Sequence, residues 1–318
     1  MTRGELQRLF GNLKVWRAKG WRAPNKPLLA LWAIGRCIRN EARLTPYDEV
    51  ARELGALLRQ FGPPRKRVNP DLPFWHLRKD GVWEVPESDR ISQTRDFHAH
   101  ITSLRREGAQ GGFPADVFLA LQQDKMMALD IAFSLLDAHF PDTLHDDILR
   151  AVGINSGFSQ LAEERLGERN RREALQDFQQ VRRRLRDPAF SKAVLEAYGE
   201  RCAVCAFSVR LHGIPLALDA AHIKWHRAGG RDRDKVRNGL SLCALHHRLF
   251  DAGAFTVSPK YTVIIASAAV GPGSGQSLEK FSHRSILLPE KVEDYPDCKS
   301  LNWHYREVFG PIVKGVNY

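Results

Sequence analysis

The sequence predicts an α+β protein of two domains: a mainly helical amino-terminal domain with a small hairpin, and a carboxy-terminal domain organised around a metal. Three observations support this fold class. The length of 318 residues corresponds to about two ordinary domains, and the 43% hydrophobic content is enough for packed cores. Apolar residues recur at helical spacing in the first half. The second half combines strand-like segments with paired cysteines and histidines.

The charge balance favours a polyanionic partner. Lysine and arginine number 48 against 37 acidic residues, which gives a net charge of +11. No apolar run reaches the roughly 18 to 20 residues that a membrane span needs. The amino terminus is charged and amphipathic and lacks a secretory apolar core. The composition therefore predicts a cytoplasmic protein and no membrane segment.

The first two helices are predicted near the amino terminus. Residues 5–16 carry apolar side chains at helical spacing. A largely buried helix is expected to follow from about residue 25, because Asn25 is a plausible N-cap and proline is tolerated in the first turn. Pro27 and Ala30 are three residues apart on this helix, so they share one face near its amino-terminal end.

Residues 41–73 predict a further helical unit that ends in a loop rich in proline. This loop holds three consecutive cations, Arg65, Lys66 and Arg67. They either contact phosphate or form a solvated basic turn, and the net positive charge favours phosphate contact. Residues 73–85 have aromatic and branched residues on both sides of a Lys-Asp-Gly turn, a pattern that predicts a hairpin.

Two histidines follow without a convincing metal-binding spacing. His98 and His100 alternate as the residues of a strand do. Packing and DNA contact explain them equally well.

The remaining elements are predicted from periodicity and composition. Residues 124–150 indicate buried helices, and residues 161–187, which are dense in charge with few apolar anchors, indicate a linker helix. Residues 255–266 indicate a hairpin. Trp303 and Phe309 are expected in a closing amphipathic helix.

Two ligand pairs predict a structural metal. Cys202 and Cys205 form a Cys-x-x-Cys pair, and Cys243 and His246 form a Cys-x-x-His pair. Four sulfur and nitrogen ligands suit one tetrahedral Zn²⁺. Because a closed four-ligand shell leaves no position for water, this ion is expected to be structural.

The chemistry must then belong to three polar residues beside these pairs, His222, Asn238 and His247. A histidine titrates near neutrality, so His222 can be unprotonated at working pH and accept a proton from water. A zinc ribbon with incidental histidines is the structural alternative. Two correctly spaced pairs together with His222, Asn238 and His247 in this order favour a nuclease site over a zinc ribbon.

The segments DAAHI, NGL and LHHRLFD resemble the HNH endonuclease family, and the similarity extends over roughly residues 188–310. The resemblance implies two antiparallel strands and a helix around one metal, with His222 on the first strand and His247 at the start of the helix. It implies that His222 is the general base and that Asn238 holds the local geometry. His247 would ligate a catalytic Mg²⁺ or Mn²⁺.

The second ligand of that catalytic ion is left open. Many HNH enzymes carry an acidic or histidine ligand immediately before the base, where this chain has Ala221. Asp219 is the nearest acid and one candidate. Asp251 is another, because residues i and i+4 share a helix face and His247 lies four residues earlier. Asp251 is equally well explained as a turn residue before Gly253.

The segments NKPLLAL, PFWHL, DGVWEV and QGGFP resemble the sulfur-binding domain of McrA-like type IV restriction enzymes, over roughly residues 1–160. That family recognises DNA in which a phosphorothioate sulfur replaces a non-bridging phosphate oxygen. The resemblance implies that Pro27, Ala30 and the stem of Lys26 line a small apolar pocket for sulfur. Where family members can carry an aromatic residue before the proline, this chain has Lys26.

An apolar pocket would favour sulfur, because sulfur is larger than oxygen and a poorer hydrogen-bond acceptor. A phosphate oxygen placed there would lose hydrogen bonds at a cost of roughly 1–3 kcal/mol, a discrimination of about tenfold to a hundredfold. Base contacts must supply the remaining specificity. The candidates to read base edges in the major groove are Arg105, Arg106 and Gln110.

The resulting hypothesis is a modification-dependent DNA endonuclease. Residues 1–160 would select phosphorothioated double-stranded DNA, residues 161–187 would form a linker, and residues 188–318 would hydrolyse a nearby phosphodiester with structural Zn²⁺ and catalytic Mg²⁺ or Mn²⁺. Double-strand cleavage needs two nuclease sites or one acting twice, so a homodimer is left open. The alternatives are an HNH nuclease that reads methylated or unmodified DNA, and a non-cleaving zinc-stabilised DNA-binding protein.

Overall fold

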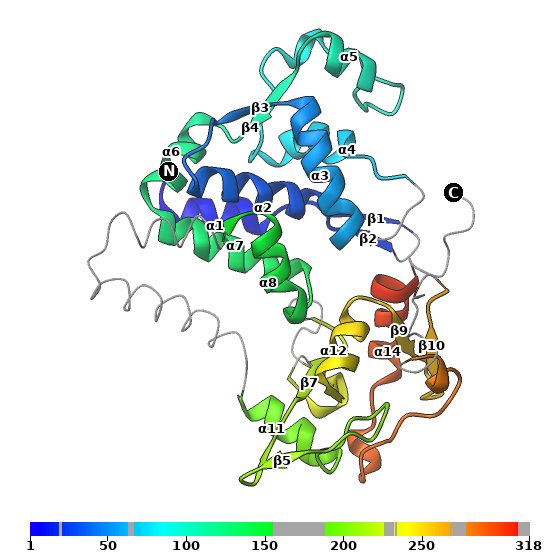
Figure 1. Cartoon of the computed structure of the whole chain (residues 1–318). Helices are drawn as coiled ribbons and strands as arrows, with labels where there is room; N and C mark the ends of the chain where they lie inside the picture. The colour runs from blue at the N-terminus through cyan, green and yellow to red at the C-terminus, as the bar shows by residue number, and fades with distance from the viewer. Residues whose placement is uncertain are drawn as a thin grey trace. The chain divides into compact units, whose positions relative to one another are not determined.

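The computed structural model describes residues 1–18, 21–62, 67–154, 188–225, 232, 234–267, 269 and 278–310. They form two compact units (Figure 1). The first holds most of the described chain up to residue 154, and the second holds the described residues from 188 onward together with Phe140–Leu144. Helices dominate the first unit, while short antiparallel strands and helices make up the second, so the predicted α+β class is confirmed.

One buried helix, α2 (Asn25–Ile38), organises the first unit. It is apolar on almost every side, as a helix enclosed by others must be, and it packs against α3, α6 and α7. The helices of this unit are α1 (Arg3–Gly11), α2, α3 (Tyr47–Phe61), α4 (Asp71–His76), α5 (Ile101–Arg106), α6 (Ala115–Gln123), α7 (Lys125–His139) and α8 (Asp142–Ala151). Pro24, and not Asn25, occupies the N-cap position of α2.

The first helix is shorter than predicted. It begins with a capping box, in which the Thr2 hydroxyl accepts from the Glu5 backbone and the Glu5 carboxylate accepts from the Thr2 backbone. It ends at Gly11, and the chain continues into β1 (Trp16–Ala18), which pairs with β2 (Trp21–Ala23).

The hairpin predicted over residues 73–85 is wrong. This segment forms the end of α4 and a 3-10 turn, Leu77–Asp80, after which Gly81 adopts a positive φ of 78°. Its aromatic residues suggested strands, but Phe74 and Trp83 are core side chains that pack edge to face, 5.9 Å between ring centroids. Burial in a helical core therefore outweighed their preference for strands.

The second small sheet of the first unit lies elsewhere. β3 (Leu44–Pro46) pairs antiparallel with β4 (Gln110–Gly112). A Cβ on Gly111 would lie 2.7 Å from the Phe74 ring, and a Cβ on Gly112 would lie 1.9 Å from the Arg43 carbonyl oxygen. Gly111 therefore lets this strand approach the aromatic core, and Gly112 lets it approach the backbone at the start of β3.

The second unit contains the predicted strand, strand and helix. β7 (Leu218–His222) pairs antiparallel with β8 (Gly239–Cys243), so that His222 lies opposite Gly239 and Leu218 opposite Cys243. The helix α12 (Ala244–Asp251) follows β8 directly. The register therefore puts His222 at the end of β7, where the chain enters the connecting loop.

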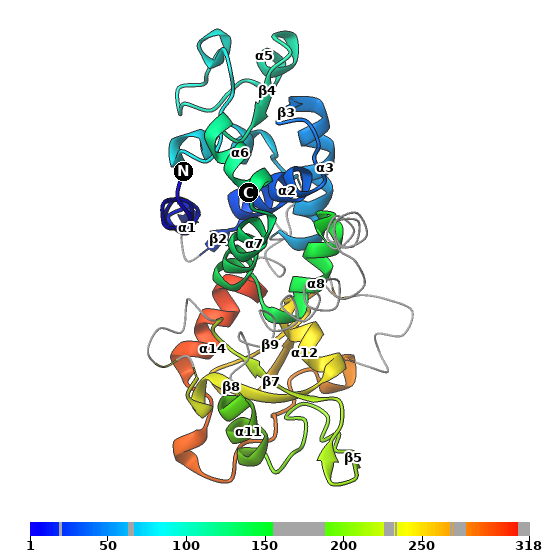
Figure 2. The same ribbon diagram turned by 90° about the vertical axis from the view of Figure 1, so that its left-hand side faces the viewer.

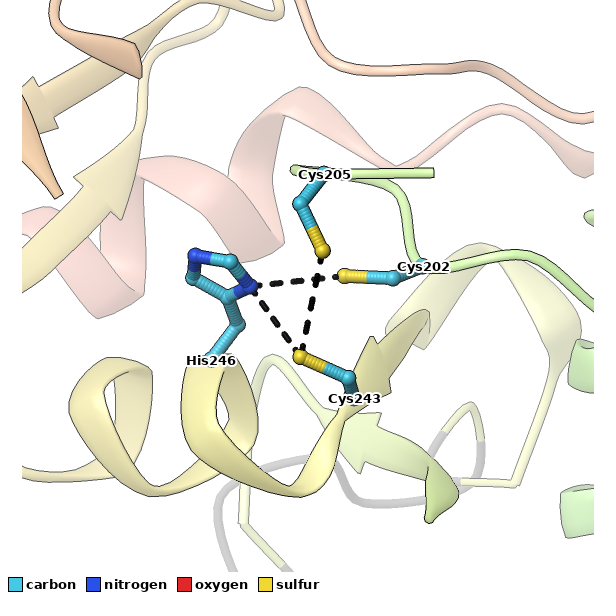
Figure 3. A group of neighbouring side chains, drawn as sticks. All are labelled: Cys202, Cys205, Cys243 and His246. Atoms are coloured by element: carbon cyan, nitrogen blue, oxygen red, sulfur yellow. Dashed lines mark hydrogen bonds between the residues drawn. The ribbon is translucent and has the colours of Figure 1, made fainter. Parts of the chain in front are cut away.

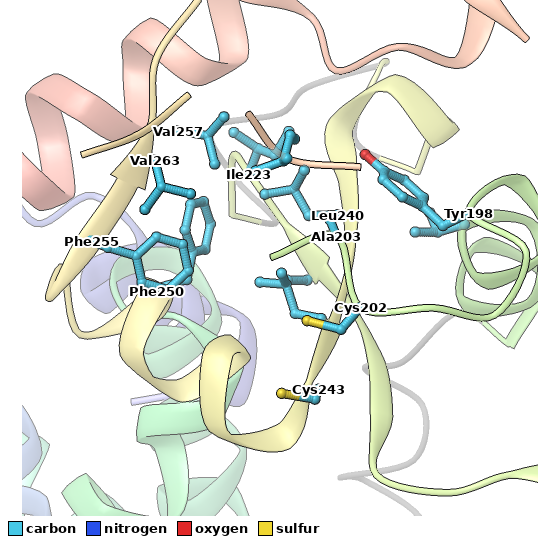
Figure 4. Close-up of a cluster of buried hydrophobic side chains, with 14 of the residues drawn as sticks. Tyr198, Cys202, Ala203, Ile223, Leu240, Cys243, Phe250, Phe255, Val257 and Val263 are labelled. Carbon is cyan, nitrogen blue, oxygen red and sulfur yellow. The ribbon is translucent and has the colours of Figure 1, made fainter. Parts of the chain in front are cut away.

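The helix α11 (Pro188–Ala197) packs against both strands (Figure 2). A Cβ on Gly239 would lie 2.5 Å from Cγ2 of Val194 and 3.0 Å from Cζ of Phe190. This glycine allows α11 to approach the strand pair closely. The core between these elements and α12 includes Ile223, Leu240 and Phe250 (Figure 4).

The other elements of the second unit complete that core. The hairpin predicted over residues 255–266 is confirmed as β9 (Phe255–Val257) and β10 (Val263–Ile265). The closing helix is α14 (Cys298–His304), which contains Trp303 and continues into a π-helical turn, Tyr305–Phe309. Three short 3-10 turns are Val236–Asn238, Glu279–Phe281 and Val292–Asp294.

A short hairpin in the second unit exposes an apolar face. In β5 (Arg210–Leu211) and β6 (Ile214–Pro215), Leu211 lies opposite Ile214. The Leu216 N–H donates to the Val209 carbonyl, so the strand alternation puts these four apolar side chains on one face. They are 41% to 65% exposed. Such a face is a candidate contact surface.

Some predictions fall outside the described residues. They include the linker helix over residues 161–187 and the cations Arg65 and Lys66. Among the helices that the structure does describe, none is both long and apolar enough to cross a membrane.

Candidate metal centre and nuclease site

The four predicted zinc ligands lie together (Figure 3). Cys202 and Cys205 belong to a turn after α11, Cys243 ends β8 and His246 lies in the first turn of α12. The donor atoms all lie within 4.8 Å of one another. A backbone hydrogen bond explains the meeting, because the Ala203 N–H donates to the Ser241 carbonyl at 2.7 Å and so joins the turn of the first pair to β8, which α12 follows directly.

The distances fit one tetrahedral ion. Sγ of Cys205 lies 3.9 Å from Sγ of Cys243, and Nδ1 of His246 lies 3.6 Å from Sγ of Cys202 and 3.2 Å from Sγ of Cys243. Zinc bonds of about 2.3 Å to sulfur and 2.0 Å to nitrogen imply ligand separations of roughly 3.5 to 3.8 Å in a tetrahedron. The chemistry and spacing of the donors therefore fit Zn²⁺.

The thiols of the cluster differ in their protonation: hydrogen bonds from Cys243 lower the pKa of Cys202, whereas the pKa of Cys243 is raised. The neighbouring Cys202 thiol and burial together raise the pKa of Cys243 to about 11. Zinc would have to displace that proton, which couples metal binding to pH. The His246 ring packs edge-on against Phe255 and Phe281. Its Nε2 is buried and, in the part of the chain that the structure describes, has no hydrogen-bond partner.

Two side chains hold the His222 imidazole, Phe190 at the ring face and Asp234 at one nitrogen. Its imidazole stacks on Phe190 of α11, with ring centroids 4.0 Å apart and planes 12° apart. Its Nε2 lies 3.1 Å from Oδ1 of Asp234. The side chain remains 21% exposed, so water can reach it. The motif spacing had not indicated Phe190 or Asp234.

Asn238 ties the connecting loop to the end of β7. Its side-chain carbonyl accepts from the Lys224 backbone N–H at 3.0 Å, and its side-chain amide donates to the Lys224 carbonyl at 3.0 Å. Its own backbone carbonyl accepts from Ile223 at 2.9 Å. Asn238 is buried, and these contacts fix the backbone immediately after His222.

His247 lies between the two acids that the sequence left as alternatives. Its Nδ1 is 3.5 Å from Oδ2 of Asp219, and its Nε2 is 3.4 Å from Oδ2 of Asp251. Burial lowers the pKa of His247, but the carboxylates of Asp251 and Asp219 more than offset this, and the net direction is upward. The pair of carboxylates therefore creates a negative environment around this imidazole.

The two acids differ in exposure. Asp219 is 51% exposed, whereas Asp251 is 3% exposed and accepts a 2.5 Å hydrogen bond from the Thr143 hydroxyl. Thr143 belongs to the Phe140–Leu144 segment of the same unit. Burial raises the pKa of Asp251 to about 6. Asp219 can therefore face an ion in solvent, while Asp251 supports His247 from inside.

The residues predicted for sulfur recognition meet at the start of α2. Pro27 and Ala30 are both buried, and the Lys26 ammonium forms an ion pair with the carboxylate of Asp80, whose side chain is 2% exposed. The other Asp80 oxygen accepts from the Lys14 backbone at 3.1 Å. The Lys26 stem is thus held beside Pro27.

The predicted base-reading and phosphate residues lie on the surface of the first unit. Arg105 pairs with Asp48 at 2.8 Å, and Arg106 pairs with Glu107 at 2.7 Å. Gln110 opens β4 and is exposed, as is Arg67. Exposed pairs of this kind are worth little, so DNA phosphates can compete for these arginines.

A histidine pair near Lys26 was not predicted as a unit. Nε2 of His76 lies 2.6 Å from Nδ1 of His98, and the rings meet edge to face. Burial, followed by the charges of His98, Lys79 and Lys26, lowers the pKa of His76 to about 4. A pKa this low keeps His76 uncharged at neutral pH.

Two protein-family models match the chain. Residues 3–157 match the ScoMcrA-like DNA sulfur-binding domain, and residues 202–258 match the HNH endonuclease domain. The chain thus carries both domains, as the sequence motifs predicted. A search of curated proteins gives no match.

Solved structures show likeness to about half of this chain. The sulfur-binding domain of ScoMcrA, complexed with phosphorothioated DNA, is 21% identical with a TM-score of 0.41, and the match covers 48% of this chain and 96% of that one. The corresponding SprMcrA domain, also complexed with phosphorothioated DNA, is 22% identical with a TM-score of 0.40, covering 49% and 97%. The type IV phosphorothioation-dependent restriction endonuclease ScoMcrA is 22% identical with a TM-score of 0.43, and the match covers 48% of this chain but 33% of that one.

Proposed function

We propose that this HNH-type restriction endonuclease, whose amino-terminal part is a ScoMcrA-like DNA sulfur-binding domain, recognises phosphorothioated DNA and hydrolyses a nearby phosphodiester. We assign recognition to residues 1–160, a linker to residues 161–187 and hydrolysis to residues 188–318. The observation that carries the proposal is the presence of both domains on one chain. A DNA substrate also agrees with the net charge of +11 and with the predicted cytoplasmic location.

In the proposed reaction, His222 takes a proton from the attacking water. The water oxygen bonds to phosphorus, and the bond from phosphorus to the leaving oxygen breaks. Support comes from the partial exposure of His222 and from the contacts that hold its ring. Asn238 would fix the backbone that follows His222, which keeps the base in place without touching substrate.

We assign the catalytic ion to His247 and Asp219. Their 3.5 Å separation and the solvent exposure of Asp219 suit two neighbouring ligands of a small divalent cation, Mg²⁺ or Mn²⁺. Such an ion would supply positive charge where the phosphate and the leaving oxygen gain negative charge.

Asp251 would orient His247 without binding the ion. Its carboxylate lies 3.4 Å from Nε2 of His247, and a proton held on Nε2 by this charge would leave the Nδ1 lone pair on the Asp219 side. Carboxylates commonly hold metal-binding histidines in this way. The hydrogen bond from Thr143 fixes Asp251 in turn.

In the amino-terminal domain, we assign sulfur recognition to Pro27, Ala30 and the stem of Lys26. All three residues belong to the first two turns of α2, and an apolar pocket there would offer a phosphate oxygen few donors while sulfur would lose little. The Lys26 ammonium, already paired with Asp80, adds positive charge close to the DNA backbone. Arg105, Arg106 and Gln110 would contact bases, and Arg65, Lys66 and Arg67 would contact phosphates.

A homodimer would provide two nuclease sites for a duplex. The apolar face of the β5–β6 hairpin supports this part of the proposal, because Val209, Leu211, Ile214 and Leu216 present no charge to a phosphate backbone. An identical hairpin across a twofold axis would cover it.

A cleavage assay on the full-length protein tests the nuclease assignment. With a phosphorothioated duplex and added Mg²⁺ or Mn²⁺, we expect cleavage that His222→Ala slows by roughly 10²- to 10⁴-fold, the usual contribution of a general base. His283→Ala is the matched control, since that histidine is exposed and lies outside the site. Equal inactivity of wild type and His222→Ala on phosphorothioated, methylated and plain DNA would instead favour a non-cleaving DNA-binding protein.

A further inference from the structure

We propose that Asp234 is a positioning residue for the proton acceptor. It holds His222 in the tautomer that carries its proton on Nε2, so that Nδ1 accepts the proton of the attacking water. This inference rests on the proposed function, which makes His222 the base. It adds a residue that lies outside the His, Asn and His motif and names the nitrogen that reacts.

His222 and Asp234 are in direct contact. Nε2 of His222 lies 3.1 Å from Oδ1 of Asp234, a normal hydrogen-bond distance. An ionised carboxylate only accepts hydrogen bonds, so the facing nitrogen must be the donor. A neutral imidazole has one proton, and fixing it on Nε2 puts the basic lone pair on Nδ1.

The His222 ring cannot easily turn. Phe190 lies parallel to the imidazole at 4.0 Å, which fixes the plane of the ring. Phe190 itself is buried and belongs to α11, whose close approach depends on the missing side chain of Gly239. The imidazole is therefore fixed in plane by Phe190 and in direction by Asp234.

The loop that carries Asp234 is anchored to the end of β7. Asn238 follows four residues later and makes both side-chain hydrogen bonds to the Lys224 backbone. Between them, the Asn238 N–H donates to the Lys235 carbonyl at 2.8 Å. The segment after the base and the segment before β8 are thus joined, and Asp234 is held close to His222.

Phe190 and Asp234, which hold the His222 ring, have distinct tasks. Asp234 is the charged group that contacts the imidazole, and Phe190 is the aromatic group that covers its face. When His222 takes the proton of water it becomes a cation, and the Asp234 carboxylate stabilises that cation. Asp234 thereby acts on the reaction through His222.

Asp234→Asn is the first test, in the full-length protein. An amide can turn its NH₂ toward Nε2 and so admit the wrong tautomer. We expect kcat for metal-dependent DNA cleavage to fall about 10- to 100-fold, less than the roughly 10²- to 10⁴-fold loss of the general base itself, because His222 is still present. The KM for DNA and the zinc content should stay within twofold of the wild-type values.

Asp232→Asn is the matched control. Asp232 lies two residues earlier, is exposed and pairs with Lys235, and the substitution removes the same charge. Equal rates for Asp234→Asn and Asp232→Asn would overturn the proposal.

Two further readouts separate positioning from folding. Nitrogen-15 NMR of histidine-labelled protein, with His222→Gln to assign the signal, should show Nε2–H in the wild type and a mixture of tautomers in Asp234→Asn. In Asp234→Ala, added formate should restore part of the cleavage rate, whereas it should not restore His222→Ala. A wild-type signal from Nδ1–H, or an absence of rescue with intact folding, would contradict the proposal.

The failure of this inference is distinguishable from failure of the proposed function. If His222→Ala keeps the full cleavage rate, His222 is not the base and the proposed mechanism fails. If His222→Ala is inactive while Asp234→Asn cleaves like Asp232→Asn, only the role of Asp234 fails.

Discussion

Two neighbouring histidines on α12 have different surroundings. His246 directs Nδ1 at sulfur, 3.2 Å from Sγ of Cys243, whereas His247 lies between the carboxylates of Asp219 and Asp251. Successive residues on an α-helix point about 100° apart, so one dipeptide can serve two sites. The neighbouring donors decide the role: sulfur ligands suit a closed structural zinc site, and carboxylate oxygen suits ions that act on phosphate.

The largest expected effect tests the structural side of this comparison. Cys243→Ser should abolish zinc binding and unfold the second unit, because structural zinc contributes roughly 10–16 kcal/mol in small zinc domains, as much as a domain's whole stability. Elemental analysis and thermal unfolding measure this. Cys298→Ser is the control, since that thiol is exposed and outside the cluster. A Cys243→Ser protein with full zinc and wild-type melting would contradict the assignment.

The next effect tests the catalytic side. His247→Ala and Asp219→Asn should each slow metal-dependent cleavage by roughly 10²-fold or more, because each removes a ligand of the catalytic ion. Zinc content should not change, since neither residue touches the sulfur cluster. The melting temperature should stay unchanged in Asp219→Asn but fall in His247→Ala, because that variant removes the partner of the buried Asp251 carboxylate. Loss of zinc in His247→Ala would show that the two histidines are not separate in function.

A third histidine of the same unit, His304, differs from His246 and His247 in that it affects how stability depends on pH. His304 is buried against Phe250, with Nε2 facing the Phe250 carbonyl and Nδ1 facing the Thr256 hydroxyl. Burial lowers its pKa to about 3, below the unfolded value of about 6.5. The unfolded chain therefore binds the proton first, and this stability is present above pH 6.5 and lost as pH falls toward 3.

His304→Gln removes this titration. Between pH 7.5 and pH 4, the wild type should lose about 3 kcal/mol more unfolding free energy than the variant, as the pKa difference implies. Urea unfolding at both pH values measures it. Protonation of the zinc ligands affects both proteins alike, so the difference isolates His304. Parallel losses in the two proteins would show that His304 does not titrate in this way.

The smallest expected effect lies in the amino-terminal domain. Ala30→Val should add a methyl pair to the proposed sulfur pocket and lower the preference for phosphorothioated over plain DNA by about tenfold, the lower end of the discrimination expected from the pocket. Ala33→Val, one turn further along α2, is the control for tighter packing of this buried helix. Equal preferences in the two variants would remove Ala30 from the pocket.

The sequence predicted what local spacing determines. The zinc ligands, the strand that carries His222 and the helix that carries His247 follow from motifs in which each residue is placed by its neighbours in the chain. The sequence did not decide whether Asp219 or Asp251 is the second ligand of the catalytic ion. Both carboxylates lie close to His247, and they differ in solvent exposure, which the sequence does not reveal.

The other features of the site and fold depend on tertiary packing, which the sequence pattern does not reveal. Phe190 and Asp234 come to His222 from α11 and from the connecting loop, and no periodicity marks either residue. The hairpin predicted over residues 73–85 failed for the same reason. Its aromatic residues pack into a helical core that the local pattern does not reveal.

The most direct test of the account is the rate of cleavage of matched duplexes by the full-length protein at one fixed salt concentration. The duplexes carry phosphorothioate, methylcytosine or no modification, and the salt is fixed because backbone contacts depend strongly on ionic strength. We predict metal-dependent cleavage of the phosphorothioated duplex at least about tenfold faster than of the other two, as the sulfur pocket requires. Equal cleavage of all three would contradict sulfur recognition and leave an HNH nuclease with a different specificity.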